Sequence, residues 1–214
     1  MKKIILKKRI LTTQDLLENT YRIGKKISES DGELLPVFSE RSMKEIGVAP
    51  RLLCHRLGLI HKVVYLIILN DNNELLIQVR GDGRIDVPVG GHVSADDKSE
   101  IEALTREAYE ELGIQLKEDD VKPYKEYFQE GEYNPQKPYE INRELRQLYT
   151  IKLPHDIEVR LNAFFSNRVE KEAVKSIKWI TYDRIQEYLV DKKLAGGLKY
   201  SLPYIEGLLN SLNN

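Results

Sequence analysis

Short apolar runs alternate with polar turns through the middle of the chain. The longest apolar run, VVYLIIL at 63–69, is rich in β-branched residues and bounded by polar ones, which predicts a buried strand. A turn is expected at NDNNE, 70–74, followed by an antiparallel partner strand at ELLIQVR, 74–80. After a second turn at 81–84, the segment IDVPVGGHV at 85–93 is expected to be extended. This part of the chain therefore predicts a β-hairpin and an extended segment that ends in glycines.

A helix is predicted after the glycines. The segment SADDKSE at 94–100 offers several N-cap residues, and the apolar spacing that follows predicts a helix over about 99–112. Gly113 is well placed to end that helix in a left-handed conformation. The residues that would face the core share one stripe of the helical wheel: Ile101, Leu104, Ala108 and Leu112.

The second half of the chain predicts further strands and two helices. Strand patterns occur at 121–130, 144–153 and 174–182. A helix is expected after Thr181 or Asp183, and a last helix near Ser201, with Pro203 in its first turn, after a break at the glycine pair 196–197. Because strands and helices mix without a strict βαβ rhythm, the expected fold class is α/β, a mixed β-sheet between α-helices.

The N-terminal region is polar and weakly patterned. A helix is conceivable at 13–19, and turn signals stand at 30–33 and 47–50. We therefore expect residues 1–55 to be an N-terminal extension packed on a main domain at 56–214.

Composition narrows the class of protein without pointing to a partner. The 214 residues carry 33 basic and 34 acidic side chains, so the overall charge gives no argument for nucleic-acid binding. The single cysteine, Cys54, permits no internal disulfide, which fits a reducing compartment. Lys7 and Lys8 interrupt the first apolar stretch, and a run of seven apolar residues is too short to cross a bilayer. We expect a soluble cytoplasmic protein, with a homodimer through the N-terminal segment as a further hypothesis.

Carboxylates crowd one flank of the predicted helix. Glu107, Glu110 and Glu111 fall within an arc of roughly 100° beside the apolar stripe. Like charges at this spacing repel each other. Either water screens them on a solvated surface, or a divalent cation such as Mg²⁺ sits among them and binds substrate phosphates. Gly90 and Gly91, just before the helix, favour the second interpretation because glycine lets a ligand approach the backbone closely.

The segment GGHVSADDKSEIEALTREAYEELGI at 90–114 resembles the Nudix box. The second half of this segment, REAYEELGI at 106–114, matches the family pattern at every fixed position. The first half departs from it, since the expected glycine falls on His92 and the expected glutamate on Lys98. One inserted residue restores the glycine at Gly91. Asp97 or Glu100 is then left as the first acid. A weaker resemblance runs over about 55–205.

This resemblance implies a Nudix pyrophosphohydrolase. It would hydrolyse a diphosphate linkage in a nucleoside diphosphate derivative or a related small molecule, with Mg²⁺ or Mn²⁺ as cofactor. The implied site residues are these: metal ligands Glu107, Glu110, Glu111 and Glu144; catalytic residues Glu110, Arg106 and Glu144; cofactor-binding residues Gly90 and Gly91. Arg106 would brace the glutamates. The general base varies between subfamilies and is usually outside the box, with Glu144, Glu170 and Glu172 as the candidates.

Two other functions compete with hydrolysis. The stretches at 55–69 and 86–93 look like the isopentenyl diphosphate isomerase-like branch of the family, but Gly90 stands where those isomerases carry a cysteine. His61, His92 and Glu144 match positions that bind a metal in the isomerases; alternatively, the histidines form local hydrogen bonds that order the loop. The other rival is a Nudix-like protein that senses a nucleotide without cleaving it. Neither the substrate nor the oligomeric state follows from the sequence.

Overall fold

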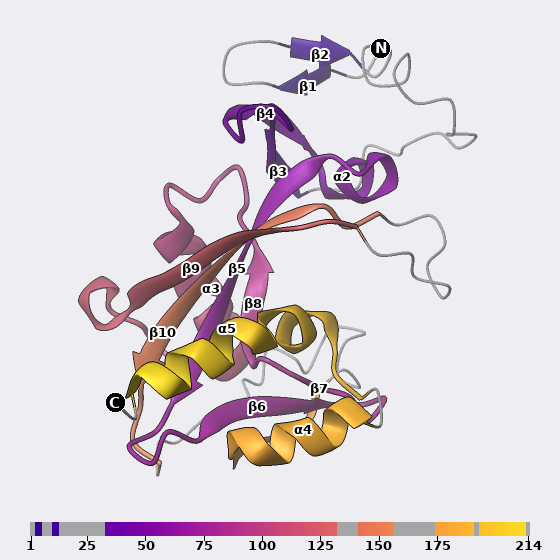
Figure 1. The fold of residues 1–214 in the computed structure, drawn as a ribbon. Helices are drawn as coiled ribbons and strands as arrows, with labels where there is room; N and C mark the ends of the chain where they lie inside the picture. The colour runs from indigo at the N-terminus through magenta and orange to yellow at the C-terminus, as the bar shows by residue number, and fades with distance from the viewer. Residues whose placement is uncertain are drawn as a thin grey trace. The chain divides into compact units, whose positions relative to one another are not determined.

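A computed structural model of the chain describes residues 3–5, 10–12, 33–131, 141–155, 174–190 and 193–212. The chain folds as two compact units (Figure 1). The first unit comprises residues 1–63, 92–100 and 127–146, and the second comprises residues 64–91, 101–126 and 147–214. The helix predicted at 13–19 lies outside the described residues.

The first unit is built around a hairpin that the sequence analysis did not predict. Strands β3 (Leu34–Phe38) and β4 (Glu45–Pro50) pair antiparallel, and β3 also pairs with the start of β5 (Ile60–Leu69). Helix α2 (Arg51–Leu57) follows β4 directly and ends at Gly58, whose φ of 61° is left-handed. A small core joins these elements: Leu35, Val37, Ala49, Leu53 and Cys54. Two further strands, β1 (Lys3–Ile5) and β2 (Ile10–Thr12), pair with each other as a two-stranded sheet.

The main run of strands lies mostly in the second unit, although three of its strands continue into the first unit. Their order is β11 (Val174–Ile180), β6 (Leu75–Arg80), β5, β10 (Glu144–Lys152) and β9 (Lys122–Gln129). Strands β5 and β6 pair antiparallel at Leu69 and Leu75, so the predicted hairpin is confirmed. Two short strands, β7 (Ile85–Asp86) and β8 (Val89–His92), pair with β6 and β5, and a 3-10 helix covers Glu118–Asp120.

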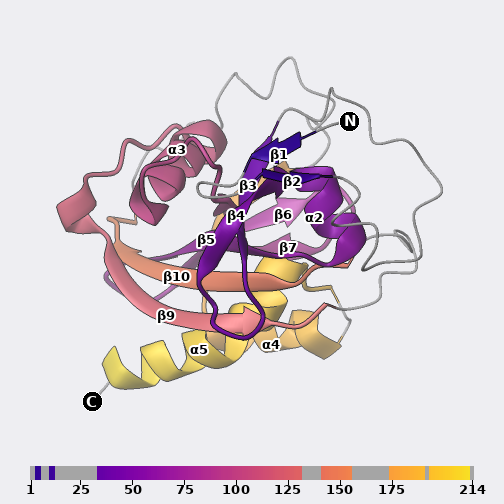
Figure 2. The same ribbon diagram turned by 90° about the horizontal axis from the view of Figure 1, so that it is seen from above.

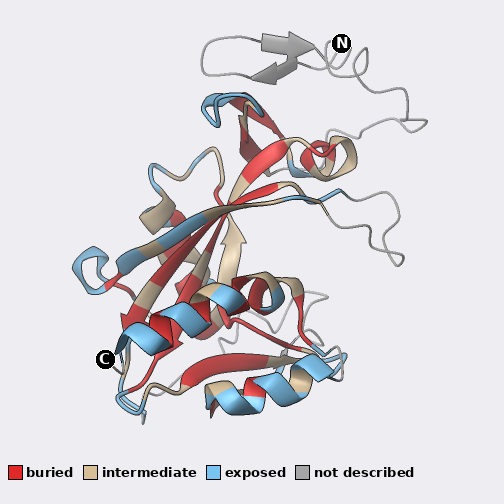
Figure 3. Ribbon diagram, viewed as in Figure 1, coloured by how far each residue is buried: buried red, intermediate tan, exposed pale blue. Residues whose placement is uncertain are grey.

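Helices lie on both faces of the sheet in the second unit (Figures 1 and 2). Helices α4 (Tyr182–Val190) and α5 (Gly196–Leu212) pack on one apolar cluster with strands β5 and β6, while α3 (Glu100–Leu112) lies on the opposite side. The outward faces of α4 and α5 are exposed (Figure 3). The predicted α/β fold class is thus confirmed. In the described part of the chain, no helix has the length and apolar character needed to cross a bilayer.

Helix α3 forms as its pattern predicts. It buries Ala103, Leu104, Ala108 and Leu112, so Ala103 joins the predicted stripe while Ile101 is only partly buried. Gly113 ends the helix with a left-handed φ of 67°, and its N–H donates to the Tyr109 carbonyl. The carboxylate-bearing flank is therefore positioned by a helix with well-defined ends.

The last helix begins earlier than the sequence predicts. The glycine pair at 196–197 is its first turn rather than a break, so Pro203 lies inside the helix. Asp86 explains this start, because its Oδ1 accepts the backbone N–H of Leu198 at 2.7 Å and so supplies an acceptor to the first turn from a distant strand. A Cβ at Gly197 would come within 3.0 Å of that same Asp86 oxygen, which is why glycine suits this position.

Candidate functional site

Strand β8, which carries the two glycines, meets the acidic helix α3 within the second unit. The Gly90 N–H donates to Glu111 Oε2 at 3.1 Å, which joins strand β8 to the last turn of α3. At Gly91 the two elements are closer still. A Cβ there would lie within 3.0 Å of three atoms, and all three belong to the Glu107 carboxylate. The absence of a side chain at Gly91 therefore makes the space that this carboxylate occupies.

Arg106 lies among the glutamates. Its NH1 donates to Glu107 Oε1 at 2.7 Å and lies 3.8 Å from Glu110 Oε2. The Arg106 side chain is 31% exposed, against 14% for Glu107 and 48% for Glu110. The Arg106 guanidinium therefore offsets negative charge on both the more buried Glu107 and the more exposed Glu110. Its contact with Glu107 holds that carboxylate beside Gly91.

Glu111 carries the most perturbed carboxyl of the group. Its pKa is raised well above the usual value of 4.5, first because burial disfavours the charged form and second because Glu107 is close. The Gly90 N–H acts in the opposite direction, and Asp86 and Glu110 add to the rise. Three other acidic side chains therefore lie near enough to Glu111 to disfavour its charged form.

The ligand chemistry of the glutamates suits a divalent metal ion. The donors are carboxylate oxygens, the ligand type that Mg²⁺ and Mn²⁺ prefer. The raised pKa of Glu111 marks a place where a positive charge would relieve both desolvation and repulsion. Glu107, Glu110 and Glu111 are the residues that would hold the ion, with Gly90 and Gly91 shaping the backbone next to it.

Glu144 lies in the first unit and has a cationic partner. It is 4% exposed, and its Oε2 accepts from both Nε and NH2 of Arg146, at 2.8 and 2.7 Å. Both residues are on strand β10, two positions apart, so their side chains share one face. These two charge-assisted contacts hold Glu144 Oε2 in place.

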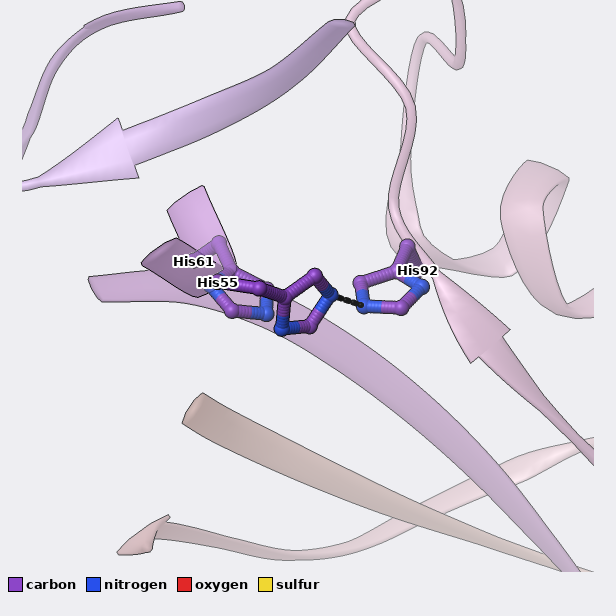
Figure 4. A group of neighbouring side chains, drawn as sticks. All are labelled: His55, His61 and His92. Atoms are coloured by element: carbon purple, nitrogen blue, oxygen red, sulfur yellow. Dashed lines mark hydrogen bonds between the residues drawn. The ribbon is translucent and has the colours of Figure 1, made fainter. Parts of the chain in front are cut away.

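Three histidines from separate elements gather in the same unit (Figure 4). His55 comes from α2, His61 from β5 and His92 from the end of β8, and one ring nitrogen from each lies within 4.8 Å of the others. Burial lowers the pKa of His61 to about 4, an effect that its bond to the Leu59 carbonyl only partly opposes. His61 is therefore neutral at physiological pH. Local hydrogen bonding, one of the two sequence interpretations, is present for this residue.

The two candidates for the first acid of the motif have partners in the first unit. Glu100 Oε1 accepts from Lys62 Nζ at 2.6 Å, and Asp97 Oδ2 accepts the Ser94 N–H at 2.7 Å. The other candidate bases, Glu170 and Glu172, lie outside the described residues.

Sequence reasoning missed three residues at these sites. His55 had no motif to mark it, and only the fold brings it to His61 and His92. Asp86 was part of an extended stretch, but its carboxylate also affects Glu111. Arg146, two residues after Glu144 on a predicted strand, was the one with a readable signal, because that spacing places both side chains on one face.

Comparisons with known proteins identify the family and the fold. A profile of the NUDIX domain matches residues 59–203. Among solved structures, the chain is similar to DR0079 from Deinococcus radiodurans at 21% identity and a TM-score of 0.59, covering 81% of this chain and 97% of that one. It is also similar to the dihydroneopterin triphosphate pyrophosphohydrolase of E. coli at 16% identity and a TM-score of 0.49, covering 68% and 92%.

A third solved structure, the MutT protein of Methanosarcina mazei Go1, is similar at 19% identity and a TM-score of 0.47, covering 69% of this chain and 93% of that one. No curated protein sequence matches the chain significantly. The profile covers more than half of the residues and includes the whole glycine strand and acidic helix. The chain therefore belongs to the Nudix family, the family of pyrophosphohydrolases that its sequence motif predicts.

Proposed function

We propose that this protein hydrolyses the diphosphate linkage of a small molecule, such as a nucleoside diphosphate derivative, with Mg²⁺ or Mn²⁺ as cofactor. In this reaction water attacks one phosphorus, the bridging P–O bond breaks, and two phosphate-terminated products leave. The observation that carries the proposal is the Glu111 carboxyl, fixed by the Gly90 N–H in a place where burial and Glu107 both oppose its charge. Such a carboxyl, beside two further glutamates, suits a bound divalent cation.

The protein side of the mechanism is mainly positioning. A bound Mg²⁺ would supply positive charge to the diphosphate oxygens and polarise them. Gly90 and Gly91 fix two carboxylates relative to the backbone, one by a hydrogen bond and one by leaving space. Arg106 holds Glu107 in that space and limits the repulsion from Glu110. Preorganisation of this kind lowers the barrier, because the groups need not rearrange as charge develops.

Glu144 is the described candidate for the general base. Its burial and its two contacts from Arg146 give it a fixed orientation, which is what proton transfer at a defined atom requires.

Two features favour hydrolysis over isomerase chemistry. A Cβ at Gly90 would come within 3.0 Å of two Tyr65 ring atoms and 3.2 Å from the Val64 carbonyl oxygen, so this position has no room for a cysteine side chain in the present packing. The single cysteine, Cys54, is buried, and burial raises the pKa of its thiol to about 12. A neutral buried thiol is a core residue rather than a reacting group.

The test is a screen of diphosphate compounds with Mg²⁺ and with Mn²⁺, followed by release of phosphate or monophosphate. We expect the wild type to cleave at least one compound only when a metal is present. Glu110→Gln should lose this turnover by at least about 100-fold while keeping the wild-type circular dichroism spectrum, because Glu110 is half-exposed and its replacement disturbs no core contact. Glu102→Gln, at an exposed position of the same helix, is the matched control and should keep full activity.

Two outcomes would contradict the proposal. If the wild type cleaves no diphosphate with either metal but binds a nucleotide, the sensing alternative is correct. If Glu110→Gln and Glu102→Gln have equal activity, the carboxylate cluster is a solvated surface and the reaction occurs elsewhere.

A further inference from the structure

One edge of a tyrosine ring lies against two glycines of the second unit. Strand β8 pairs with β5, and a Cβ at Gly90 of β8 would come within 3.0 Å of Cδ1 and Cε1 of Tyr65 on β5. A Cβ at Gly197, in the first turn of α5, would lie 3.0 Å from the same Cε1 atom. Neither glycine has a positive φ, so the local backbone does not require glycine at these positions. The close approach of the Tyr65 ring is a reason for glycine at both.

The Tyr65 ring belongs to the core of this unit. It packs, partly buried, on the apolar cluster that β5 and β6 share with α4 and α5. Because protein interiors are close-packed, the ring cannot move away from Gly90 without displacing its neighbours. An aromatic side chain that covers a glycine of the adjacent strand also stabilises the pairing of the two strands. The β8 backbone at Gly90 is therefore held by a side chain that is itself fixed.

The place of the β8 backbone matters because of what Gly90 does. Its N–H donates to Glu111 Oε2 at 3.1 Å, and Glu111 is one of the proposed metal ligands. A donor and an acceptor about 3.6 Å apart no longer form a hydrogen bond. A retreat of the backbone by about 0.5 Å would therefore release the Glu111 carboxylate from its only printed backbone donor.

We propose that Tyr65 is a positioning residue of the candidate metal site, because its ring edge holds the β8 backbone where Gly90 can donate to Glu111. Tyr65 acts through Gly90 rather than through the ion itself. The inference rests on the proposed metal-dependent hydrolysis and adds to it a residue that no motif marks. Outer partners of this kind typically change metal affinity 10–100-fold when they are lost.

The same ring links the residue types at positions 65 and 90. Because a side chain at position 90 and the Tyr65 ring need the same space, a large residue at 65 requires glycine at 90. Once the ring is removed, the closest remaining neighbour of a Cβ at Gly90 is the Val64 carbonyl oxygen at 3.2 Å. Tyr65 is therefore also the residue that keeps a cysteine out of position 90, and with it the isomerase chemistry.

The first test measures hydrogen exchange of the Gly90 amide by NMR in metal-free protein, relative to amides in the middle of β6 that report global opening. Tyr65→Ala should speed this exchange at least about 10-fold, because the β8 backbone is released. Tyr65→Phe keeps both ring atoms that face Gly90 and should exchange like the wild type. The matched control is Tyr188→Ala on α4, which removes another partly buried ring of the same cluster, beside Lys178 of β11, and should leave the relative Gly90 exchange unchanged.

The second test measures Mn²⁺ binding by the loss of the free-ion signal in electron paramagnetic resonance. Tyr65→Ala should weaken binding about 10–100-fold, whereas Tyr65→Phe and Tyr188→Ala should bind like the wild type. Gly90→Ala should also weaken binding at least about 10-fold. Adding Tyr65→Ala to Gly90→Ala should weaken it no further, because the new Cβ then has no ring to displace.

The proposal is wrong if Tyr65→Ala changes neither Gly90 exchange nor Mn²⁺ affinity, or if Tyr188→Ala has the same effects. It is also wrong if Tyr65→Phe is as damaging as Tyr65→Ala, since the hydroxyl would then be the acting group. Failure of the proposed hydrolysis looks different: the wild type would neither bind Mn²⁺ nor cleave a diphosphate. In that case the Gly90 exchange rates still decide whether Tyr65 holds β8 in place.

Discussion

Replacing Gly91 by alanine tests how the site is assembled. The new Cβ would come closer than 3.0 Å to three atoms of the Glu107 carboxylate, a distance that real Cβ atoms essentially never show. Gly91 is not among the glycines with positive φ, so alanine fits the local backbone conformation and the perturbation is confined to this contact. The carboxylate must retreat by roughly 1 Å from the position that Arg106 now fixes.

Stability and activity should respond very differently. Overpacking costs about 1–3 kcal/mol, and the low end applies because the displaced atoms are the far end of a flexible side chain. Alanine also reduces the conformational entropy of the unfolded chain, which stabilises the folded state by about 0.4–1 kcal/mol. The net change in unfolding free energy should therefore stay within about 2 kcal/mol. A misplacement of about 1 Å in a reacting constellation costs on the order of 100-fold in rate, so kcat/KM should fall by about that factor.

The assay is Mg²⁺-dependent cleavage of the compound that the diphosphate screen identifies, with urea unfolding measured on the same preparations. Gly196→Ala is the matched control, because a Cβ there has its nearest neighbour, Tyr200 Cε2, at 3.9 Å. It should leave both quantities close to wild type. Combining Gly91→Ala with Glu107→Gln should lower activity no further than the more damaging single variant, since both act on one carboxylate. Wild-type kcat/KM in Gly91→Ala would refute this reasoning.

Three further predictions concern other residues. In metal-free protein, the raised pKa of Glu111 makes the free energy of unfolding depend on pH: the contribution of this group is fully present below about pH 4.5 and is lost as pH rises through the folded-state pKa. Glu111→Gln should remove this loss, so with EDTA at pH 8 the variant should unfold at a higher urea concentration than the wild type. An equal or lower unfolding midpoint would contradict this prediction. The Cys54 thiol, with a pKa of about 12, should not react with iodoacetamide at pH 8 until urea unfolds the protein, and rapid native labelling would show that it is accessible. Asp86→Ala should cost about 1–3 kcal/mol in urea unfolding by leaving the Leu198 N–H without its acceptor, whereas Asp71→Ala in an exposed turn should change stability by less than about 0.5 kcal/mol; equal effects would refute the capping role.

Local patterns predicted the elements that local physics controls. The β5–β6 hairpin, helix α3 and its end at Gly113 all follow from apolar spacing and glycine chemistry within a few residues. The start of α5 did not, because the acceptor for its first turn is Asp86, more than a hundred residues away in the chain. The hairpin of β3 and β4 was also missed, since its strands are short and its core is shared with α2.

The candidate sites divide in the same way. The glutamates of α3 lie on a single helix, so their common flank could be read from the sequence. The histidine cluster could not, because His55, His61 and His92 come from three elements that only the fold brings together. The partner of Glu144 is two residues away on the same strand, and it was within reach of the pattern.

The most direct test of the central claim is a diffraction experiment on crystals soaked in Mn²⁺, with data collected at a wavelength where manganese scatters anomalously. We expect an anomalous peak within ligand distance, about 2.0–2.3 Å, of carboxylate oxygens from Glu107, Glu110 and Glu111, beside Gly90 and Gly91. No peak at these carboxylates, with the side chains turned into solvent, would contradict the metal-dependent mechanism.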